Sequence, residues 1–426
     1  MVSKRSVEND LIEKSYEVSI GNFELAAIHL RDARNLLYGI QNLRENRALS
    51  KATILMAAAA LESNLTYLAQ IALKFVEARP HRFHRAQVNF LRGVDEAIDD
   101  SGRMVEIRSR QVLLERMQIV PNLMGRAIDR TYELSLRSAV AKKLERTIAR
   151  RDAIVHPRFD RYISAVGWWE AAEAVDAVEL YLQSVDQCLH PYLMGYSALL
   201  WTIKGPTKDD VGVGYRTFGK RWPRRPISTM REHRLVDVLL TEWLDAIFMT
   251  EIAFVHDTEG DSNGSMLTRA ALVLLYAMVD AQLAIASQWR MHEKPSAFQE
   301  AEKLFLSEVA MGVGHDGEIW VDGDQHPFKK RVKAIPAVLA RCIDGKDFVV
   351  DLGKGWGQDL LRGYVLRNGV VHSSPGEQMP RVSKDELRSA VTAVRAYFAE
   401  LSSGVAGAFQ HMEALLETGG RAHPTR

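Results

Sequence analysis

Two hexapeptides in this chain carry an arginine and a histidine five positions apart. The first runs from Arg151 to His156, and the second, about half the chain length further on, runs from Arg367 to His372. Both follow the pattern Arg, then Asp or Asn, a small residue, an aliphatic residue, Val and His. Guanidinium groups match phosphate geometry and imidazoles titrate near neutral pH, so this combination suits chemistry on a phosphodiester.

A third stretch with the same spacing, from Arg79 to His84, provides an internal comparison. It contains Pro80, has neither Asp nor Asn after the arginine, and has no counterpart in the other half of the chain. We therefore interpret this third match as accidental.

Cleavage of RNA by its own 2′-hydroxyl requires a base, an acid and positive charge on the phosphorane oxygens. Two histidines can divide the acid and base tasks without a metal. Asp152 lies four positions before His156, and Asn368 four before His372, so each pair shares one helix face. Because a carboxylate favours the charged imidazole, we expect His156 to act as the acid and His372 as the base. Alternatively, the histidines cap helix ends and the arginines satisfy buried carboxylates.

The two motifs belong to a diverged duplication of the whole chain. Further segments recur in the same order at nearly the same spacing as the motifs. The matches are Arg116, Pro121, Arg126, Ile128 and Asp129 with Arg331, Pro336, Arg341, Ile343 and Asp344; Ala174, Val175, Ala177, Val178 and Tyr181 with Ala390, Val391, Ala393, Val394 and Tyr397; and 51–68 with 269–286. In the last segment Glu62 aligns with Asp280. Each acid lies in an apolar helix, where it either orients the arginine of its motif or forms a structural salt bridge.

Apolar residues at three- and four-residue intervals predict helices in both halves. Alternating patterns are nearly absent; only 319–321 and 348–352 are candidates for short strands or extended loops. We therefore expect an all-α protein of two fused helical bundles, each of four to six helices, that form an internal pseudo-dimer. The predicted domains are 1–203 and 234–426. Residues 204–233, rich in Gly, Pro and basic side chains, are the predicted linker.

The bulk composition limits the functional classes. Lys and Arg number 55 against 54 Asp and Glu, which argues against a protein that coats nucleic acid along its whole surface. Cys188 and Cys342 provide neither a metal motif nor a disulfide framework, and the N-terminal residues lack an apolar signal segment. The apolar run 266–289 is interrupted by polar residues, which favours a buried helix. These observations predict a cytoplasmic protein with no membrane partner, no metal and no cofactor.

Local basic segments are the candidate RNA contacts. Around the first motif these are Lys142, Lys143, Arg146, Arg150 and Arg158, and in the linker Lys220, Arg221, Arg224 and Arg225. The linker cations are interleaved with aromatic residues, which suits phosphate pairing with base stacking. Alternatively, the linker is a solvated tether and the first segment an ordinary charged helix face.

The paired motif at the end of a late helix, with an acid in an earlier apolar helix, resembles the HEPN (higher eukaryotes and prokaryotes nucleotide-binding) superfamily. The resemblance covers about 22–192 and 234–408. It implies a metal-independent endoribonuclease whose composite site combines Arg151, His156, Arg367 and His372, supported by Asp152, Asn368, Glu62 and Asp280. It also implies a toxin or phage-defence role, controlled by a partner protein or nucleotide, in a monomeric pseudo-dimer or a homodimer. The alternative is a non-catalytic module of this family that binds RNA, nucleotide or protein.

Overall fold

The computed structural model describes most of the chain, in segments. These are residues 26, 28–37, 47–78, 80–98, 104–108, 113–132, 134–135, 138–155, 166–189, 245–250, 253–254, 262–313, 319–323, 327–371 and 380–409. The chain divides into two compact units: Met1–Arg151, Val166–Trp222 and Gly369–Pro380 form the first, and Asp152–Ala165, Pro223–Asn368 and Arg381–Arg426 form the second. The predicted linker 204–233 lies outside the described residues, and the predicted domain limits stay a prediction.

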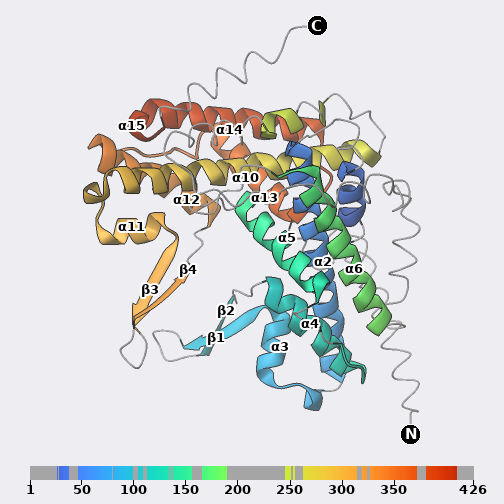
Figure 1. The fold of residues 1–426 in the computed structure, drawn as a ribbon. Helices are drawn as coiled ribbons and strands as arrows, with labels where there is room; N and C mark the ends of the chain where they lie inside the picture. The colour runs from blue at the N-terminus through green and yellow to red at the C-terminus, as the bar shows by residue number, and fades with distance from the viewer. Residues whose placement is uncertain are drawn as a thin grey trace. The chain divides into compact units, whose positions relative to one another are not determined.

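The first unit is built around one long helix. Its elements are α2 (Arg47–Ala78), α3 (Arg85–Arg92), β1 (Val94–Ile98), β2 (Met104–Arg108), α4 (Leu113–Ala127), α5 (Ala139–Val155) and α6 (Trp168–Leu189). Helix α2 is apolar on nearly all sides, so it is stable only when surrounded by other helices. It packs against α3, α4 and α6, which run alongside it in Figure 1.

The second unit repeats this element order. It contains α10 (Ser262–Glu293), α11 (Glu300–Leu306), β3 (Val309–Val313), β4 (Ile319–Gly323), α12 (Phe328–Leu339), a π-helical turn (Ala340–Asp344), α13 (Gly355–Val371), α14 (Lys384–Gly404) and α15 (Ala406–Phe409). Helix α10 is the central buried helix and contacts α11, α12, α14 and α15. The all-α class is therefore confirmed, since helices build the described core of each unit.

The equivalent elements keep the spacing that the sequence predicts. The interval between the first residues of α2 and α10 differs by a single position from the interval between those of α5 and α13. Helices α4 and α12 each contain a proline at their ninth position, Pro121 and Pro336. Because proline lacks an N–H and disturbs a helix interior, its presence at the same place in both helices is a specific shared feature. The duplication is thus visible in the order of elements as well as in the residues.

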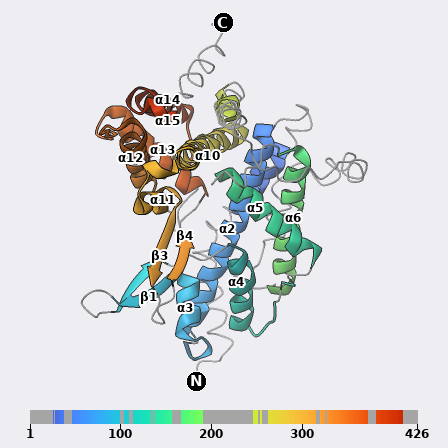
Figure 2. The same ribbon diagram turned by 60° about the vertical axis from the view of Figure 1, so that its left-hand side comes forward.

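The described part of each unit also contains a short antiparallel hairpin. Strand β1 pairs with β2, and β3 pairs with β4. In Figures 1 and 2 each hairpin extends away from the helices of its own unit. Sequence periodicity predicted only part of β4, at 319–321, and missed the other strands because strands this short show no clear alternation. The second candidate, 348–352, is not a strand.

Among the described residues, two helices are long and apolar enough to cross a membrane by length and composition. These are Arg47–Glu77 and Met266–Glu293, and both are mostly buried within the protein. The core helix of a globular unit meets the same criterion, so these spans are weak evidence for a membrane. The prediction that 266–289 is a buried helix is confirmed.

A polar cluster links α11 to the π-helical turn. Arg341 forms an ion pair with Glu302 at 2.5 Å, and the Cys342 thiol donates a hydrogen bond to the other carboxylate oxygen of Glu302 at 3.3 Å. Partial burial, together with the bond to Glu302 and its charge, raises the pKa of Cys342 to about 11. The thiol is consequently held in its unreactive protonated form near neutral pH.

This cluster predicts slow alkylation of Cys342. A pKa of about 11 instead of 9.0 lowers the thiolate fraction at pH 8 by about two orders of magnitude. We expect the iodoacetamide rate of Cys342, followed by peptide mass spectrometry, to rise with pH until about 11. Glu302→Gln should move this profile to lower pH, because it removes the charge that opposes the thiolate. An unchanged profile in that variant would contradict the role of Glu302.

Candidate active site

The arginines of the two motifs occupy the same place in their units. Arg151 lies four residues before Val155, the last residue of α5, and Arg367 lies four residues before Val371, the last residue of α13. Both helices are 17 residues long. The histidines that complete the motifs, His156 and His372, lie outside the described residues, so their predicted positions stay predictions.

In the first unit, Arg151 is anchored by the acid on the central helix. Its Nη2 lies 2.7 Å from Oε1 of Glu62, and the two side chains are 16% and 14% exposed. Arg116 of α4 belongs to the same cluster: it donates to the Thr66 hydroxyl at 3.3 Å, and the Glu62 charge acts on it. Burial lowers the pKa of Arg116, and Glu62 opposes that shift. Glu62 therefore compensates two guanidinium groups.

The second unit repeats the cluster in a more buried form. Oδ1 of Asp280 lies 2.8 Å from Nη2 of Arg331, with side-chain exposures of 4% and 8%. Burial raises the pKa of Asp280, while the charges of Arg331 and Arg367 act against the rise. Glu308 approaches Arg331 from the other side at 3.3 Å. Arg367 is only 4% exposed and donates through Nη1 to Oδ1 of its neighbour Asn368 at 2.9 Å.

The plan common to both units is thus an acid of the central helix with two arginines and a tyrosine, and Glu308 is an additional acid in the second unit. Tyr181 on α6 donates its hydroxyl proton to the carbonyl of Met117, and Tyr397 on α14 donates to that of Val332, each at 3.1 Å. Tyr397 is fully buried near Asp280 and Arg331, and burial raises its pKa well above the ordinary value. These tyrosines fix the last helix of each repeat against the helix that carries Arg116 or Arg331.

The acids do not occupy identical positions along their helices. Measured from the first residue of its helix, Asp280 lies three positions further along α10 than Glu62 lies along α2. Positions that differ by three lie on the same face of a helix, so both acids still reach an arginine of a neighbouring helix. The shorter Asp280 pairs directly with Arg331, while the longer Glu62 pairs with Arg151.

The predicted site residues are thus only partly brought together. Glu62 forms an ion pair with Arg151, and Asp280 lies near enough to Arg367 for the charge of that arginine to oppose the rise in the pKa of Asp280. Arg116 and Arg331 complete the clusters, although the sequence reasoning had used them only as markers of the repeat. The sequence did contain an indication of this role, because Arg116 and Arg331 are charged residues on an otherwise apolar helix face at matching positions of the two repeats. Asp152 is exposed, and its predicted role beside His156 stays a prediction.

Most of the described basic residues of α5 are paired with acids of α6. Lys143 bonds to Asp176 at 2.6 Å, and Arg146 and Arg150 both bond to Glu173. Partial burial raises the pKa of Glu173, but these two hydrogen bonds outweigh it and hold the pKa below the ordinary value. These three cations therefore fasten α5 to α6.

The remaining candidates for RNA contact are less constrained. Lys142 is exposed, and its side chain makes no hydrogen bond or ion pair with any residue of the described segments. Arg158, Lys220, Arg221, Arg224 and Arg225 lie outside the described residues. The predicted RNA contact through α5 accordingly depends on Lys142.

Comparisons with known proteins leave the family open. No protein-family model matches the sequence, and neither curated proteins nor solved structures give a match. Within the described part of the chain, no group of three or more His, Cys, Asp or Glu side chains is arranged to hold a metal ion. The repeated clusters of an acid with arginines, around Glu62 and Asp280, therefore carry the functional inference.

Proposed function

We propose that this protein is an HEPN-like, metal-independent endoribonuclease with one composite site that takes an arginine and a histidine from each repeat. The observation that carries the proposal is the repeated acid-anchored arginine. Arg151 is held by Glu62, and the charge of Arg367 acts on Asp280; each arginine lies near the C-terminal end of a helix and five positions before a histidine. A guanidinium that is already held in place loses less conformational entropy when it binds a phosphate than a mobile guanidinium does.

The proposed reaction takes up one proton and releases one proton. The 2′-oxygen of the RNA attacks phosphorus while His372 accepts its proton. The bond from phosphorus to the 5′-oxygen breaks, and His156 donates a proton to that oxygen. The products are a 2′,3′-cyclic phosphate and a 5′-hydroxyl, and the guanidinium charge stabilises the phosphorane between these steps.

The two arginines are assigned different shares of this task. Arg151 is held by Glu62 through Nη2 and keeps 16% of its side chain exposed, so we assign it the contact with the phosphate. Arg367 is nearly buried and hydrogen-bonded to Asn368, so we assign it the role of positioning Asn368 beside His372. Its positive charge also acts on the site from a distance. A toxic or defensive role under the control of a partner would follow from the family resemblance alone.

The wild-type protein provides the first test. Purified protein should cleave end-labelled RNA in EDTA and leave 2′,3′-cyclic phosphate ends. RNA carrying a single 2′-deoxy nucleotide at the cleaved position should stay intact there, because it lacks the attacking oxygen. Cleavage of the 2′-deoxy substrate would contradict the mechanism.

The alternative is a non-catalytic member that binds RNA, nucleotide or protein. It is favoured by the depth of the Asp280 cluster, since an ion pair with side chains only 4% and 8% exposed serves a structural purpose equally well. Binding of RNA without cleavage under the same conditions would decide for this alternative.

A further inference from the structure

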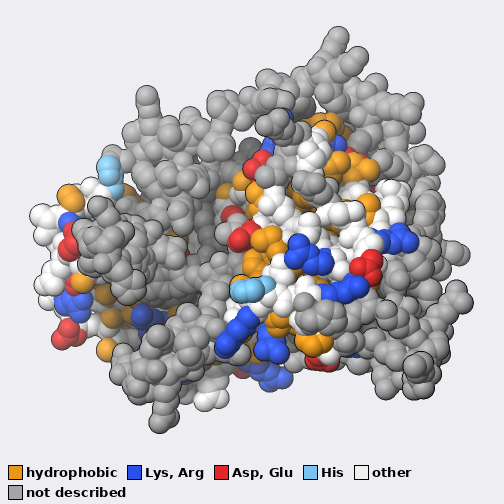
Figure 3. All heavy atoms as spheres, turned by 90° about the horizontal axis from the view of Figure 1, so that it is seen from below, with side chains coloured by type: hydrophobic (Ala, Val, Ile, Leu, Met, Phe, Trp, Pro, Cys, Tyr) orange, Lys and Arg blue, Asp and Glu red, His pale blue; other side chains and the backbone are white. Residues whose placement is uncertain are grey.

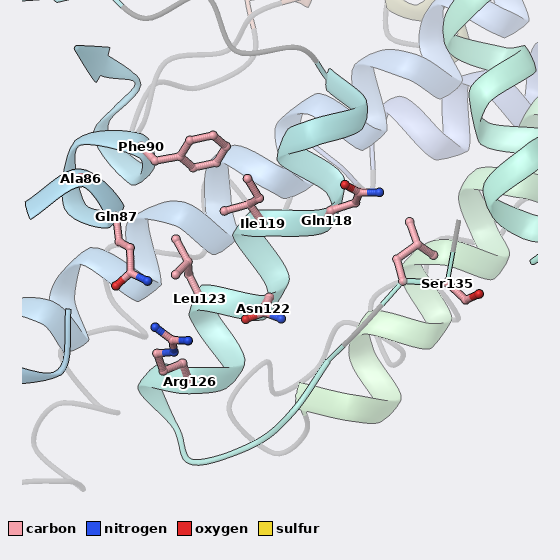
Figure 4. A pocket seen from close by; sticks show the side chains of 10 residues that line it. Ala86, Gln87, Phe90, Gln118, Ile119, Asn122, Leu123, Arg126 and Ser135 are labelled. Carbon is pink, nitrogen blue, oxygen red and sulfur yellow. The ribbon is translucent and has the colours of Figure 1, made fainter. Parts of the chain in front are cut away.

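The first unit contains a pocket that the proposed nuclease chemistry does not use. It has a volume of about 980 Å³ and lies between α3, α4 and the segment that precedes α5. Figure 4 shows Phe90, Ile119 and Leu123 along one side of this space, with Gln87 and Arg126 at one end of it. Apolar walls with a few polar groups are typical of small-molecule sites.

Arg126 is the unusual member of this pocket. It is exposed, and its side chain makes no hydrogen bond or ion pair with any residue in the described segments. The nearby acid Asp129 is paired with Arg82 at 2.5 Å. Figure 3 shows Lys and Arg side chains beside hydrophobic ones on the face where the lower ends of α3 and α4 of Figure 1 lie.

In the second repeat, a carboxylate neutralises the equivalent arginine. The counterpart of Arg126 in the matched segments is Arg341, and it is paired with Glu302. At the same repeat spacing, the counterpart of Glu302 in the first unit is Gln87. The duplicated chain therefore has the same arginine twice, with a carboxylate beside it in one copy and an amide in the other.

The change from Glu to Gln leaves the local structure intact. Oε1 of Gln87 accepts the backbone N–H of His84 at 3.0 Å, and Oε2 of Glu302 accepts that of Gln299 at 2.8 Å. Both bonds belong to a capping box at the start of the short helix, which requires an oxygen acceptor but no charge. The difference between the repeats is therefore one of charge at the pocket.

Two further amides distinguish the pocket from its counterpart. Gln118 and Asn122 line it, whereas the equivalent positions in the second unit are Lys333 and Ala337. Asn122 uses its amide N–H for the carbonyl of Tyr132 at 3.2 Å, so its oxygen is left as an acceptor. The pocket thus combines neutral amides, an apolar wall and one arginine whose side chain has no carboxylate partner among the described residues.

We infer that this pocket binds a small organic anion, in which a phosphate or carboxylate meets Arg126 and an attached flat apolar group lies against Phe90, Ile119 and Leu123. Guanidinium binds either anion through paired N–H donors, and the ring face of Phe90 accepts a flat apolar partner. This inference is independent of RNA cleavage, because it uses none of the motif residues.

The test uses the full chain with phenyl phosphate and benzoate as probes and neutral phenol as the comparison. Ligand-observed NMR titration measures affinities in the millimolar range. We expect at least one anion to bind the wild type more tightly than phenol does. The comparison between phenyl phosphate and benzoate then identifies the preferred anion.

Three variants locate the binding. Arg126→Gln should weaken it about 10- to 100-fold, the value of a charge-assisted hydrogen bond. Gln87→Glu should have a similar effect, since it restores the neutralising carboxylate of the other repeat. Arg341→Gln, the matched change in the second unit, should leave the affinity unchanged. Failure of both anions to bind the wild type, or equal affinity in Arg126→Gln, would overturn the inference.

Discussion

His156→Ala and His372→Ala are each expected to lower the rate of RNA cleavage by about 100- to 10,000-fold, the usual contribution of a general acid or base. Both losses should be large because each histidine serves one half of a single proton-transfer cycle. The measurement is the initial rate of cleavage of labelled RNA in EDTA, with far-UV circular dichroism to confirm that each variant is folded.

His84→Ala is the matched control for these two variants. His84 also follows an arginine by five positions, but it is the N-cap of α3, where its Nδ1 accepts the backbone N–H of Ala86 at 3.3 Å. Its replacement should leave cleavage unchanged and cost only the modest stability of a cap. Survival of cleavage in both His156→Ala and His372→Ala would exclude a site that needs one histidine from each repeat.

The pH dependence of the two variants separates their roles. His156→Ala should remove the limb of the pH-rate profile that depends on a protonated group, and His372→Ala the limb that depends on a deprotonated one. The reason is the partner four positions earlier, charged Asp152 in one motif and neutral Asn368 in the other. Identical loss of both limbs in each variant would exclude this division of roles.

Asp280→Ala is expected to lower the free energy of unfolding by about 3–5 kcal/mol, the cost of removing one partner from a buried ion pair. Asp280 is surrounded by protein, and its loss leaves the guanidinium groups of Arg331 and Arg367 without their shared carboxylate. The measurement is urea unfolding, together with hydrogen exchange in peptides of α10 and α12, which locates the destabilised unit.

Glu62→Ala provides the comparison for Asp280→Ala. Glu62 and Arg151 are 14% and 16% exposed, against 4% and 8% for Asp280 and Arg331, so water compensates part of the loss in the first unit. We expect a smaller change, confined to α2, α4 and α5. The double variant Asp280→Ala with Arg331→Met should recover part of the stability, because it also removes the buried guanidinium that has lost its nearest carboxylate, while Glu308, the second partner of Arg331, is 21% exposed. An equal cost for Glu62→Ala and Asp280→Ala would contradict the different burial of the two clusters.

Much of the fold follows from local patterns in the sequence. The run of apolar residues in α10 predicts a helix that must be surrounded, and the structure buries it. The repeat spacing predicts equivalent helices, and α5 and α13 have equal length at that spacing. The hairpins were harder to predict because two short strands carry little periodicity and depend on pairing with each other.

The charged clusters show where local patterns stop being sufficient. The sequence pointed to Glu62 and Asp280 as acids that either orient the motif arginines or form structural salt bridges, and Glu62 does pair with Arg151. In the second unit, Arg331 of α12 is the direct partner of Asp280. The basic stretch on α5 suggested a phosphate surface, yet Lys143, Arg146 and Arg150 bond to acids of α6. A partner on another helix cannot be identified from the spacing within one helix.

The sequence by itself determined the duplication, the helical class and the two arginine-histidine motifs, because each is a matter of residue order and local period. Only the tertiary structure decided which charges compensate each other. Glu62 and Arg151 are 89 positions apart, and their ion pair forms because packing sets the rotation of α2 and α5 about their axes. Packing also brings together Arg341 and Glu302. Arg126, the counterpart of Arg341 in the first repeat, has no carboxylate partner among the described residues. Long-range packing selects partners among many charged residues of suitable type, and the local sequence does not contain that selection.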